Sequence, residues 1–174
     1  MLKTPGQELL LILDSVILPR GAAYVAGPLE TGREYFILKS QQRIVTPDLR
    51  HVNESQLSRF ASNLRAKINR PVIDPGLLRC PNWSGADYGI FFTEVVKRYV
   101  SELWLIDGWE YSLGATREFV ISQELCISCF DEFGAKITKA KGIELIRSSC
   151  AFLNSIQQNC DRFRTRLSSL EQLS

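Results

Sequence analysis

The chain contains a single histidine, His51, and an odd number of cysteines, five in 174 residues. Zinc sites usually need four cysteine or histidine ligands. The spacing Cys126-Ile-Ser-Cys129 supplies one pair, and the sequence offers no second pair. Redox-active pairs of this spacing stand at helix starts, whereas residues 126–131 are predicted as a strand. We therefore expect reduced cysteines in the core, no metal ion and no cofactor.

Long apolar runs and an excess of charge of one sign are also missing. The run Leu9–Leu13 ends at Asp14 and is far too short to cross a membrane; a helix over about residues 5–17 explains it better. The 21 basic residues nearly balance the 19 acidic ones and are scattered. They give no electrostatic argument for binding nucleic acid. We expect a cytoplasmic protein that binds neither a membrane nor a nucleic-acid polymer.

Short apolar runs alternate with segments in which apolar residues recur at helical spacing. The predicted strands are 22–28, 71–75, 103–107 and 126–131, and the predicted helices between them are 54–68, 88–101 and 113–124. Strands that alternate with helices predict a parallel sheet with helices on both faces. We expect a single α/β domain over 1–174, flavodoxin-like or Rossmann-like, with about four or five strands.

The ends of two predicted strands indicate a binding site. Gly27 follows one strand and lets the backbone approach a ligand because it has no Cβ, and Pro28 turns the chain out of the sheet. The other strand ends at Gly108, and the helix after it carries Glu118. Ligands of open α/β sheets bind outside the carboxyl ends of the strands, so Glu118 should point into a crevice there.

Two segments flank this predicted core. Residues 29–53 lack clear periodicity and are interpreted as an insertion or lid, in which Arg33 either contacts a phosphate or is solvated. Residues 139–172 are predicted as one long helix because apolar residues recur at steps of three and four. Such a helix would outrun a small sheet, so we expect a homo-oligomer, dimer or tetramer, built partly on it. Alternatively, it folds back over the N-terminal helix.

The segments Tyr24–Pro28 and Gly108–Glu118 resemble those of the nucleoside 2-deoxyribosyltransferase superfamily. The resemblance spans roughly residues 22–132 and includes Phe60–Pro75. It implies cleavage of the N-glycosidic bond of a nucleoside or nucleotide, which is a small-molecule substrate. It also implies that Glu118 attacks the anomeric carbon and forms a covalent glycosyl-enzyme, which water or another base resolves, as in retaining glycosidases.

A second acid must protonate the leaving base. The family supplies this acid from the helix before the motif strand, where Glu94 is the best match and Asp87 the runner-up. Asp107 and Glu110 flank the loop and are further alternatives. The resemblance implies substrate contacts at Tyr24, Gly27, Pro28, Asp107, Gly108, Trp109, Ser112, Gly114 and Ala115.

The sequence departs from the family's transferases at Ser112, where they usually carry a carboxylate. Ser112-Leu-Gly114 is more similar to the branch that hydrolyses 2′-deoxynucleoside 5′-monophosphates. A serine hydroxyl and the amides of a helix N-terminus suit a phosphate, which a carboxylate would repel. The resemblance therefore favours a phosphorylated substrate. An uncharacterised subgroup also shares this form of the motif.

Other interpretations remain open for these residues. Ser112 and Gly114 also suit a helix cap, Tyr24 either stacks on a base or packs in the core, and Trp109 is expected to be a ligand wall while Trp104 is expected in the core. A catalytically silent nucleotide-binding module would use the same crevice. A phosphoribohydrolase of the cytokinin-activating type is a weaker alternative, because its Pro-Gly-Gly-x-Gly-Thr loop is missing.

Overall fold

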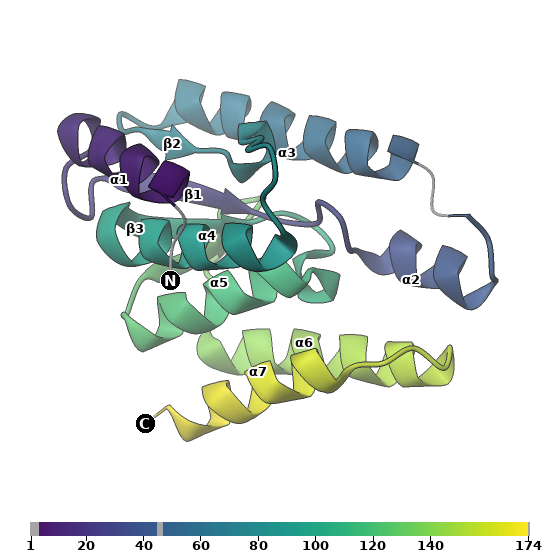
Figure 1. Cartoon of the computed structure of the whole chain (residues 1–174). Helices are drawn as coiled ribbons and strands as arrows, with labels where there is room; N and C mark the ends of the chain where they lie inside the picture. Colours follow the sequence, from purple (N-terminus) through teal and green to yellow (C-terminus); the bar gives the residue numbers. More distant parts are fainter. Residues whose placement is uncertain (1–3, 45–46, 174) are drawn as a thin grey trace.

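The computed structural model describes residues 4–44 and 47–173 and contains a four-stranded, all-parallel sheet (Figure 1). The strands are β1 (Ala22–Ala26), β2 (Val72–Ile73), β3 (Val100–Leu105) and β4 (Ser128–Asp131), in the order β2-β1-β3-β4. The predicted α/β class is confirmed. The chain order reverses between β1 and β3, and in folds of this type the ligand binds at such a reversal.

Seven helices and two short 3-10 turns surround the sheet in the part of the chain that the structure describes. The helices are α1 (Thr4–Val16), α2 (Arg33–Ser40), α3 (Pro47–Lys67), α4 (Gly85–Tyr99), α5 (Leu113–Glu124), α6 (Lys139–Ser155) and α7 (Asp161–Gln172), and the turns are η1 (Pro75–Leu77) and η2 (Trp109–Tyr111). No helix among the described residues is long and apolar enough to cross a membrane.

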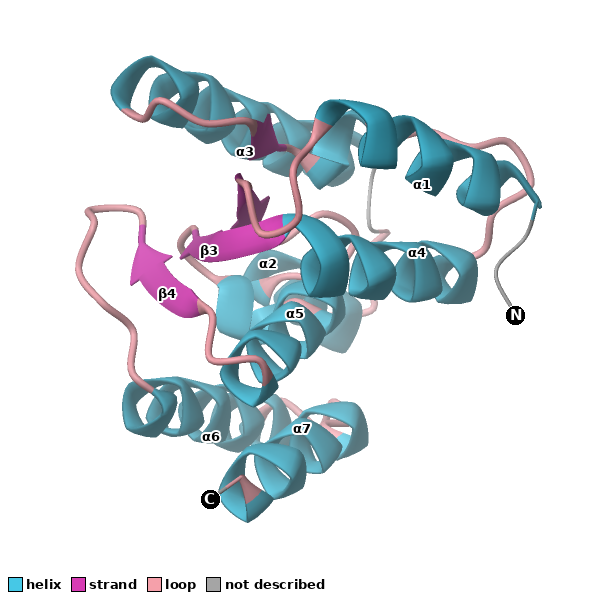
Figure 2. Cartoon of the chain, turned by 90° about the vertical axis from the view of Figure 1, so that its left-hand side faces the viewer, coloured by secondary structure: helices cyan, strands magenta, loops and turns pink. Residues whose placement is uncertain are grey.

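The helices form layers on the two faces of the sheet. Helix α3 covers one face, α4 and α5 cover the other, and α6 and α7 form a further layer outside α5 (Figures 1 and 2). Strand β1 is buried throughout and contributes to both sides. Tyr24 and Ala26 belong to the core on the α4–α5 side, and Ala23 and Val25 pack with α3. The predicted arrangement with helices on both faces is thus confirmed.

Helix α5, which carries Glu118, begins and ends where the sequence predicted. Ser112 caps it by accepting a hydrogen bond from the Ala115 amide at 3.3 Å. Seven of its twelve residues are buried, because the helix lies between the sheet and the α6–α7 layer. On the α6 side, Gly142 lets the ring of Phe119 approach closely, since a Cβ on Gly142 would stand 2.2 Å from that ring.

The predicted single helix over 139–172 is wrong: the segment forms two helices, α6 and α7. The chain turns at Gln157, whose φ of 57° is left-handed, and the amide of Gln158 donates back to the carbonyl of Leu153 at 2.8 Å. Helix α7 then packs on α5 and α6, burying Phe163 and Leu170. The apolar stripe is therefore covered within the chain, and it no longer supports an oligomer built on an overhanging helix. The alternative, that the segment folds back over the N-terminal helix, is also wrong, because α6 and α7 pack on α5 and on each other.

Residues 29–53 include α2 and the first turns of α3, which starts before the predicted 54. Leu29, Glu30 and Thr31 border the cavity described below, as does Arg50 from α3. Arg33 lies outside this cavity among the described residues; its guanidinium stands 5.0 Å from the ring centroid of Phe152 in α6. The segment thus forms one edge of the cavity, and Arg33 does not contribute to it.

The cysteines follow the prediction only in part. Cys129, Cys150 and Cys160 are buried, Cys80 is half-buried, and Cys126 is exposed in the turn between α5 and β4. All five are free thiols. Over residues 4–44 and 47–173, no three histidine, cysteine, aspartate or glutamate side chains are grouped so that they could hold a metal ion.

Candidate active site

A cavity of about 230 Å³ opens at the carboxyl ends of β1 and β3. Gly27 and residues 29–31 form one edge, and Ser112, Ala115 and Glu118 of the α5 segment form another. Helix α4 contributes an aromatic wall on a third side. The cavity therefore lies at the reversal of strand order, where the fold predicts a ligand.

The carboxyl group of Glu118 is the chemical centre of this cavity. The residue is only 8% exposed, and the hydroxyl of Tyr24 donates a hydrogen bond to its Oε1 at 2.7 Å. Burial raises the pKa of Glu118 to about 7, against the smaller lowering effects of the Tyr24 hydrogen bond and the Arg117 charge. A carboxyl group with a near-neutral pKa at a ligand cavity is suited to chemistry at physiological pH.

Tyr24 donates a hydrogen bond to Glu118, and its buried ring is not a surface on which a ligand could stack. Its ring is completely buried and meets the edge of the Phe92 ring at a centroid distance of 6.0 Å. Burial raises the pKa of Tyr24 well above its ordinary value, and the neighbouring Glu118 adds to this effect. The phenol therefore stays protonated and serves as a permanent hydrogen-bond donor to the carboxylate.

Gly27 lines the cavity, as predicted, and its lack of a side chain has a clear reason. A Cβ on Gly27 would stand 2.3 Å from Cγ1 of Ile106, so only glycine lets these two strand ends approach each other. Gly108 has a left-handed φ of 76° and starts the turn η2. Gly108 and Pro28 lie next to this edge but are not among the described residues that line the cavity.

Ser112, Gly114 and Ala115 also line the cavity. The capping role of Ser112 is confirmed, because its Oγ accepts from the Ala115 amide. The Leu113 amide donates to Oγ1 of Thr31 at 3.3 Å. Two amides of the first turn are thus already engaged, which makes this helix N-terminus a weaker anion site than the sequence suggested.

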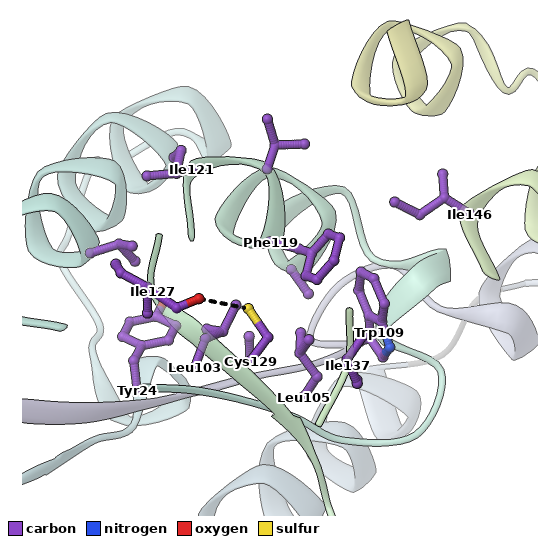
Figure 3. Packing of buried hydrophobic residues seen from close by; sticks show 14 of the residues in the cluster. Tyr24, Leu103, Leu105, Trp109, Phe119, Ile121, Ile127, Cys129, Ile137 and Ile146 are labelled. Atoms are coloured by element: carbon purple, nitrogen blue, oxygen red, sulfur yellow. Dashed lines mark hydrogen bonds between the residues drawn. The ribbon is translucent and has the colours of Figure 1, made fainter. Parts of the chain in front are cut away.

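Trp109 is not the ligand wall that the sequence predicted. It is 3% exposed and packs in the core beside Phe119, at a centroid distance of 4.8 Å (Figure 3). The turn η2 thus directs this side chain into the core and not into the cavity. Trp104, expected in the core, is partly buried and stacks on Phe130 at 5.0 Å.

The predicted acids do not meet Glu118. Glu94 lies outside the cavity-lining set and forms surface ion pairs with Arg98 at 3.3 Å and Lys97 at 3.8 Å. Phe92 of the same helix faces the cavity, and a residue two positions further along points to the opposite side of a helix. The register of α4 therefore turns Glu94 away.

The alternative acids also lie elsewhere. The carboxylate of Asp87 accepts from the amide and hydroxyl of Ser84 and caps α4. Asp107 is exposed, and its backbone amide donates a hydrogen bond to Oε2 of Glu132 at 3.4 Å. Burial raises the pKa of Glu110, yet neither Asp107 nor Glu110 is among the described residues that line the cavity.

Sequence reasoning missed several groups of this cavity. Tyr88 and Phe92, four residues apart on α4, stack at a centroid distance of 6.4 Å and form the aromatic wall; their helical spacing was the signal that could have found them. Glu54 lines the cavity with both carboxylate oxygens engaged, Oε1 by Nε of Arg50 at 2.8 Å and Oε2 by Arg79. The i,i+4 spacing of Arg50 and Glu54 was a local signal for one of these pairs, but Arg79 lies 25 positions from Glu54, so no local pattern marks the other.

Of the predicted site residues, five line the cavity: Gly27, Ser112, Gly114, Ala115 and Glu118. Tyr24 acts through its hydrogen bond to Glu118. Comparison with protein-family models, curated proteins and solved structures found no significant match.

Proposed function

We propose that the chain cleaves the N-glycosidic bond of a nucleoside or nucleotide, with Glu118 as the nucleophile. The observation that carries this proposal is the placement of Glu118: a buried carboxyl group that borders a cavity at the β1–β3 reversal and is held by Tyr24. The motif resemblance in residues 22–28 and 108–118 points to the same chemistry.

In the proposed reaction a carboxylate oxygen of Glu118 bonds to the anomeric carbon. The bond between that carbon and the base nitrogen breaks, and its electron pair leaves with the base. Water then attacks the anomeric carbon, releases the Glu118 carboxylate and supplies, in the net balance, the proton that the base takes up. An ionised Glu118 also stabilises the positive charge that develops on the sugar.

Tyr24 has a positioning role in this scheme. Its hydroxyl occupies Oε1 of Glu118, which leaves Oε2 as the attacking atom and fixes the plane of the carboxylate. A hydrogen bond donated to a carboxylate favours its ionised form, as a nucleophile requires. Tyr24 thereby opposes the effect of burial, which favours the protonated form.

The aromatic wall suits a planar base. Tyr88 and Phe92 line the cavity, and stacking of a base on aromatic rings tolerates different bases. Leu29 and Leu78 add apolar surface on the cavity's other sides. We therefore place the base against α4 and the sugar between that wall and Glu118.

Apart from Glu118, no carboxyl group without an arginine partner lines the cavity among the described residues, so none is placed to protonate the leaving base. Two other carboxylates line the cavity among the described residues: Glu54, with both oxygens engaged by arginines, and Glu30, which is exposed and bound to Arg50. We expect Glu94→Gln to retain base release, because its carboxylate lies on the outer side of α4. Loss of activity in this variant would restore Glu94 as the acid.

A catalytically silent nucleotide-binding module is the second candidate function. The position of Glu94 outside the cavity favours it, because the chemistry then lacks the acid that the motif resemblance implies. A silent module would bind nucleotides in the same cavity and release no base, and binding would be insensitive to Glu118→Gln.

The deciding experiment measures base release from nucleosides and nucleoside 5′-monophosphates by liquid chromatography. Glu118→Gln should lower the rate by at least about a thousandfold, whereas Glu144→Gln, an exposed α6 control, should leave it unchanged. Absence of release from every substrate by the wild type, with and without an acceptor base, would refute the enzymatic proposal.

A further inference from the structure

A second cavity adjoins the one that holds Glu118. It has a volume of about 310 Å³ and is lined by Gly85, Ala86, Arg117, Arg162, Thr165 and Arg166. Gly85, Arg117 and Arg162 line both cavities, so the two are adjacent. A ligand beside Glu118 and a group in the second cavity would therefore border the same two arginines, Arg117 and Arg162.

Three arginines converge on this second cavity from two helices. Arg117 belongs to α5, directly before Glu118, and Arg162 and Arg166 stand one turn apart on α7. Burial lowers the pKa of Arg166, and the charges of Arg117 and Arg162 lower it further, while Glu124 acts in the opposite direction. Three positive charges gathered at one cavity create a positive potential there, which attracts an anion.

Ion pairs do not engage these three guanidinium groups. Within residues 4–44 and 47–173, the arginines that pair with a carboxylate are Arg50, Arg70, Arg79, Arg98, Arg147 and Arg164, and Arg117, Arg162 and Arg166 are not among them. The three are therefore available to a ligand. Guanidinium groups bind phosphate oxygens in pairs of parallel hydrogen bonds.

Gly89 leaves room for the guanidinium of Arg117 beside helix α4. A Cβ on Gly89 would stand 1.8 Å from an Nη of Arg117, so the guanidinium lies directly against the backbone of α4. Glycine inside a helix lowers its stability by roughly 1 kcal/mol relative to alanine. At this position its absence of a side chain gives Arg117 the space to reach both cavities.

We propose that Arg117, Arg162 and Arg166 bind a phosphate group of the ligand whose glycosidic bond lies at Glu118. The substrate class is then a phosphorylated nucleoside, which deepens the proposed function and rests on it. The phosphate lies toward α7 and not at the Ser112 end of α5, where two amides are already engaged. A small ligand fits better than a nucleic-acid polymer because the arginines line a cavity next to a partly enclosed site.

The test measures binding by titration calorimetry, in a Glu118→Gln background that prevents turnover. The ligands are the four common nucleosides, their 5′-monophosphates, inorganic phosphate and a single-stranded oligonucleotide. We expect the preferred monophosphate to bind roughly 10- to 100-fold more tightly than its nucleoside. The double change Arg162→Ala with Arg166→Ala should abolish this preference.

Two further variants keep the result interpretable. Arg164→Ala removes an exposed charge from the same helix, where Arg164 pairs with Asp161, and it should retain the full preference. Gly89→Ala displaces the Arg117 guanidinium without removing its charge, and it should reduce the preference in a protein that circular dichroism shows to be folded.

An unchanged preference in the double variant, or an equal loss in Arg164→Ala, would overturn the phosphate subsite. If inorganic phosphate binds as tightly as the monophosphate, the arginines form a site for a free anion. If the oligonucleotide binds more tightly, they form a site for a polymer. Both outcomes contradict the proposal. Because binding is measured without turnover, a phosphate preference in a protein that releases no base would refute the proposed catalysis and leave the subsite standing.

Discussion

Replacement of Glu118 by glutamine should stabilise the fold above neutral pH. Burial raises the pKa of Glu118 from an ordinary value of 4.5 to about 7. Each pH unit between these values corresponds to about 1.4 kcal/mol, so ionising Glu118 in the folded state costs about 3 kcal/mol of stability. Glutamine keeps the shape of the side chain and an oxygen for the Tyr24 hydroxyl, but it carries no charge.

The sign of the effect follows from the raised pKa. Below about pH 4.5 the carboxyl group is protonated in the folded and the unfolded chain, and the two proteins should be equally stable. As the pH rises to about 7 the wild type should lose about 3 kcal/mol relative to Glu118→Gln, and the difference should persist at higher pH.

Urea unfolding at pH 4, 5.5, 7 and 8.5, followed by circular dichroism, measures this difference. Glu144→Gln serves as the control, because Glu144 is exposed on α6 and its replacement should give no comparable pH-dependent gap. A wild type that is more stable than Glu118→Gln at pH 8.5 would refute the reasoning. It would mean that Tyr24 and Arg117 stabilise the carboxylate more than burial destabilises it.

Three further predictions address the proposed nucleophile Glu118, the strand ends and the C-terminal turn. Base release should rise with pH through about 7 as Glu118 ionises, and Tyr24→Phe should move this rise upward by about one to two pH units; a rate that falls over this range would make Glu118 an acid. Gly27→Ala should destabilise the fold by about 1–3 kcal/mol in urea unfolding, with partial recovery when Ile106 is shortened to alanine; full stability of the single variant would contradict the close approach. Gln157→Gly should raise stability by about 1 kcal/mol, because glycine adopts the left-handed conformation without strain, and a loss of stability would argue against that conformation.

The sheet and helix α5 were predictable because their signals are local. Apolar strands bounded by glycine or proline give a period that differs from that of amphipathic helices, and Ser112 marks the start of α5 by its capping chemistry. Glu118 was predictable for the same reason, since its distance from the end of β3 places it in the first turns of that helix.

The remaining errors concern direction and tertiary contact. The helix that carries Glu94 was predicted, but its rotation about its own axis depends on how α4 packs against β1 and α5. Trp109 lies in the loop where the sequence placed it, but its side chain enters the core and not the cavity. The turn at Gln157 interrupts neither the apolar spacing nor the helical composition, so periodicity alone could not reveal it. The bond between Tyr24 and Glu118 joins residues 94 positions apart, beyond the reach of any local pattern.

Helix α7 contributes to both the core and the second cavity, and this bears on how the protein can change over evolutionary time. Phe163, Leu167 and Leu170 anchor the helix in the core, while Arg162 and Arg166, next to this apolar stripe on the helix, line the second cavity. Arg162 is exposed, and surface substitutions usually alter stability by less than about 0.5 kcal/mol. Under the proposed phosphate subsite, ligand preference can therefore drift by mutation of Arg162 while Glu118, buried among residues that also hold the fold, stays fixed.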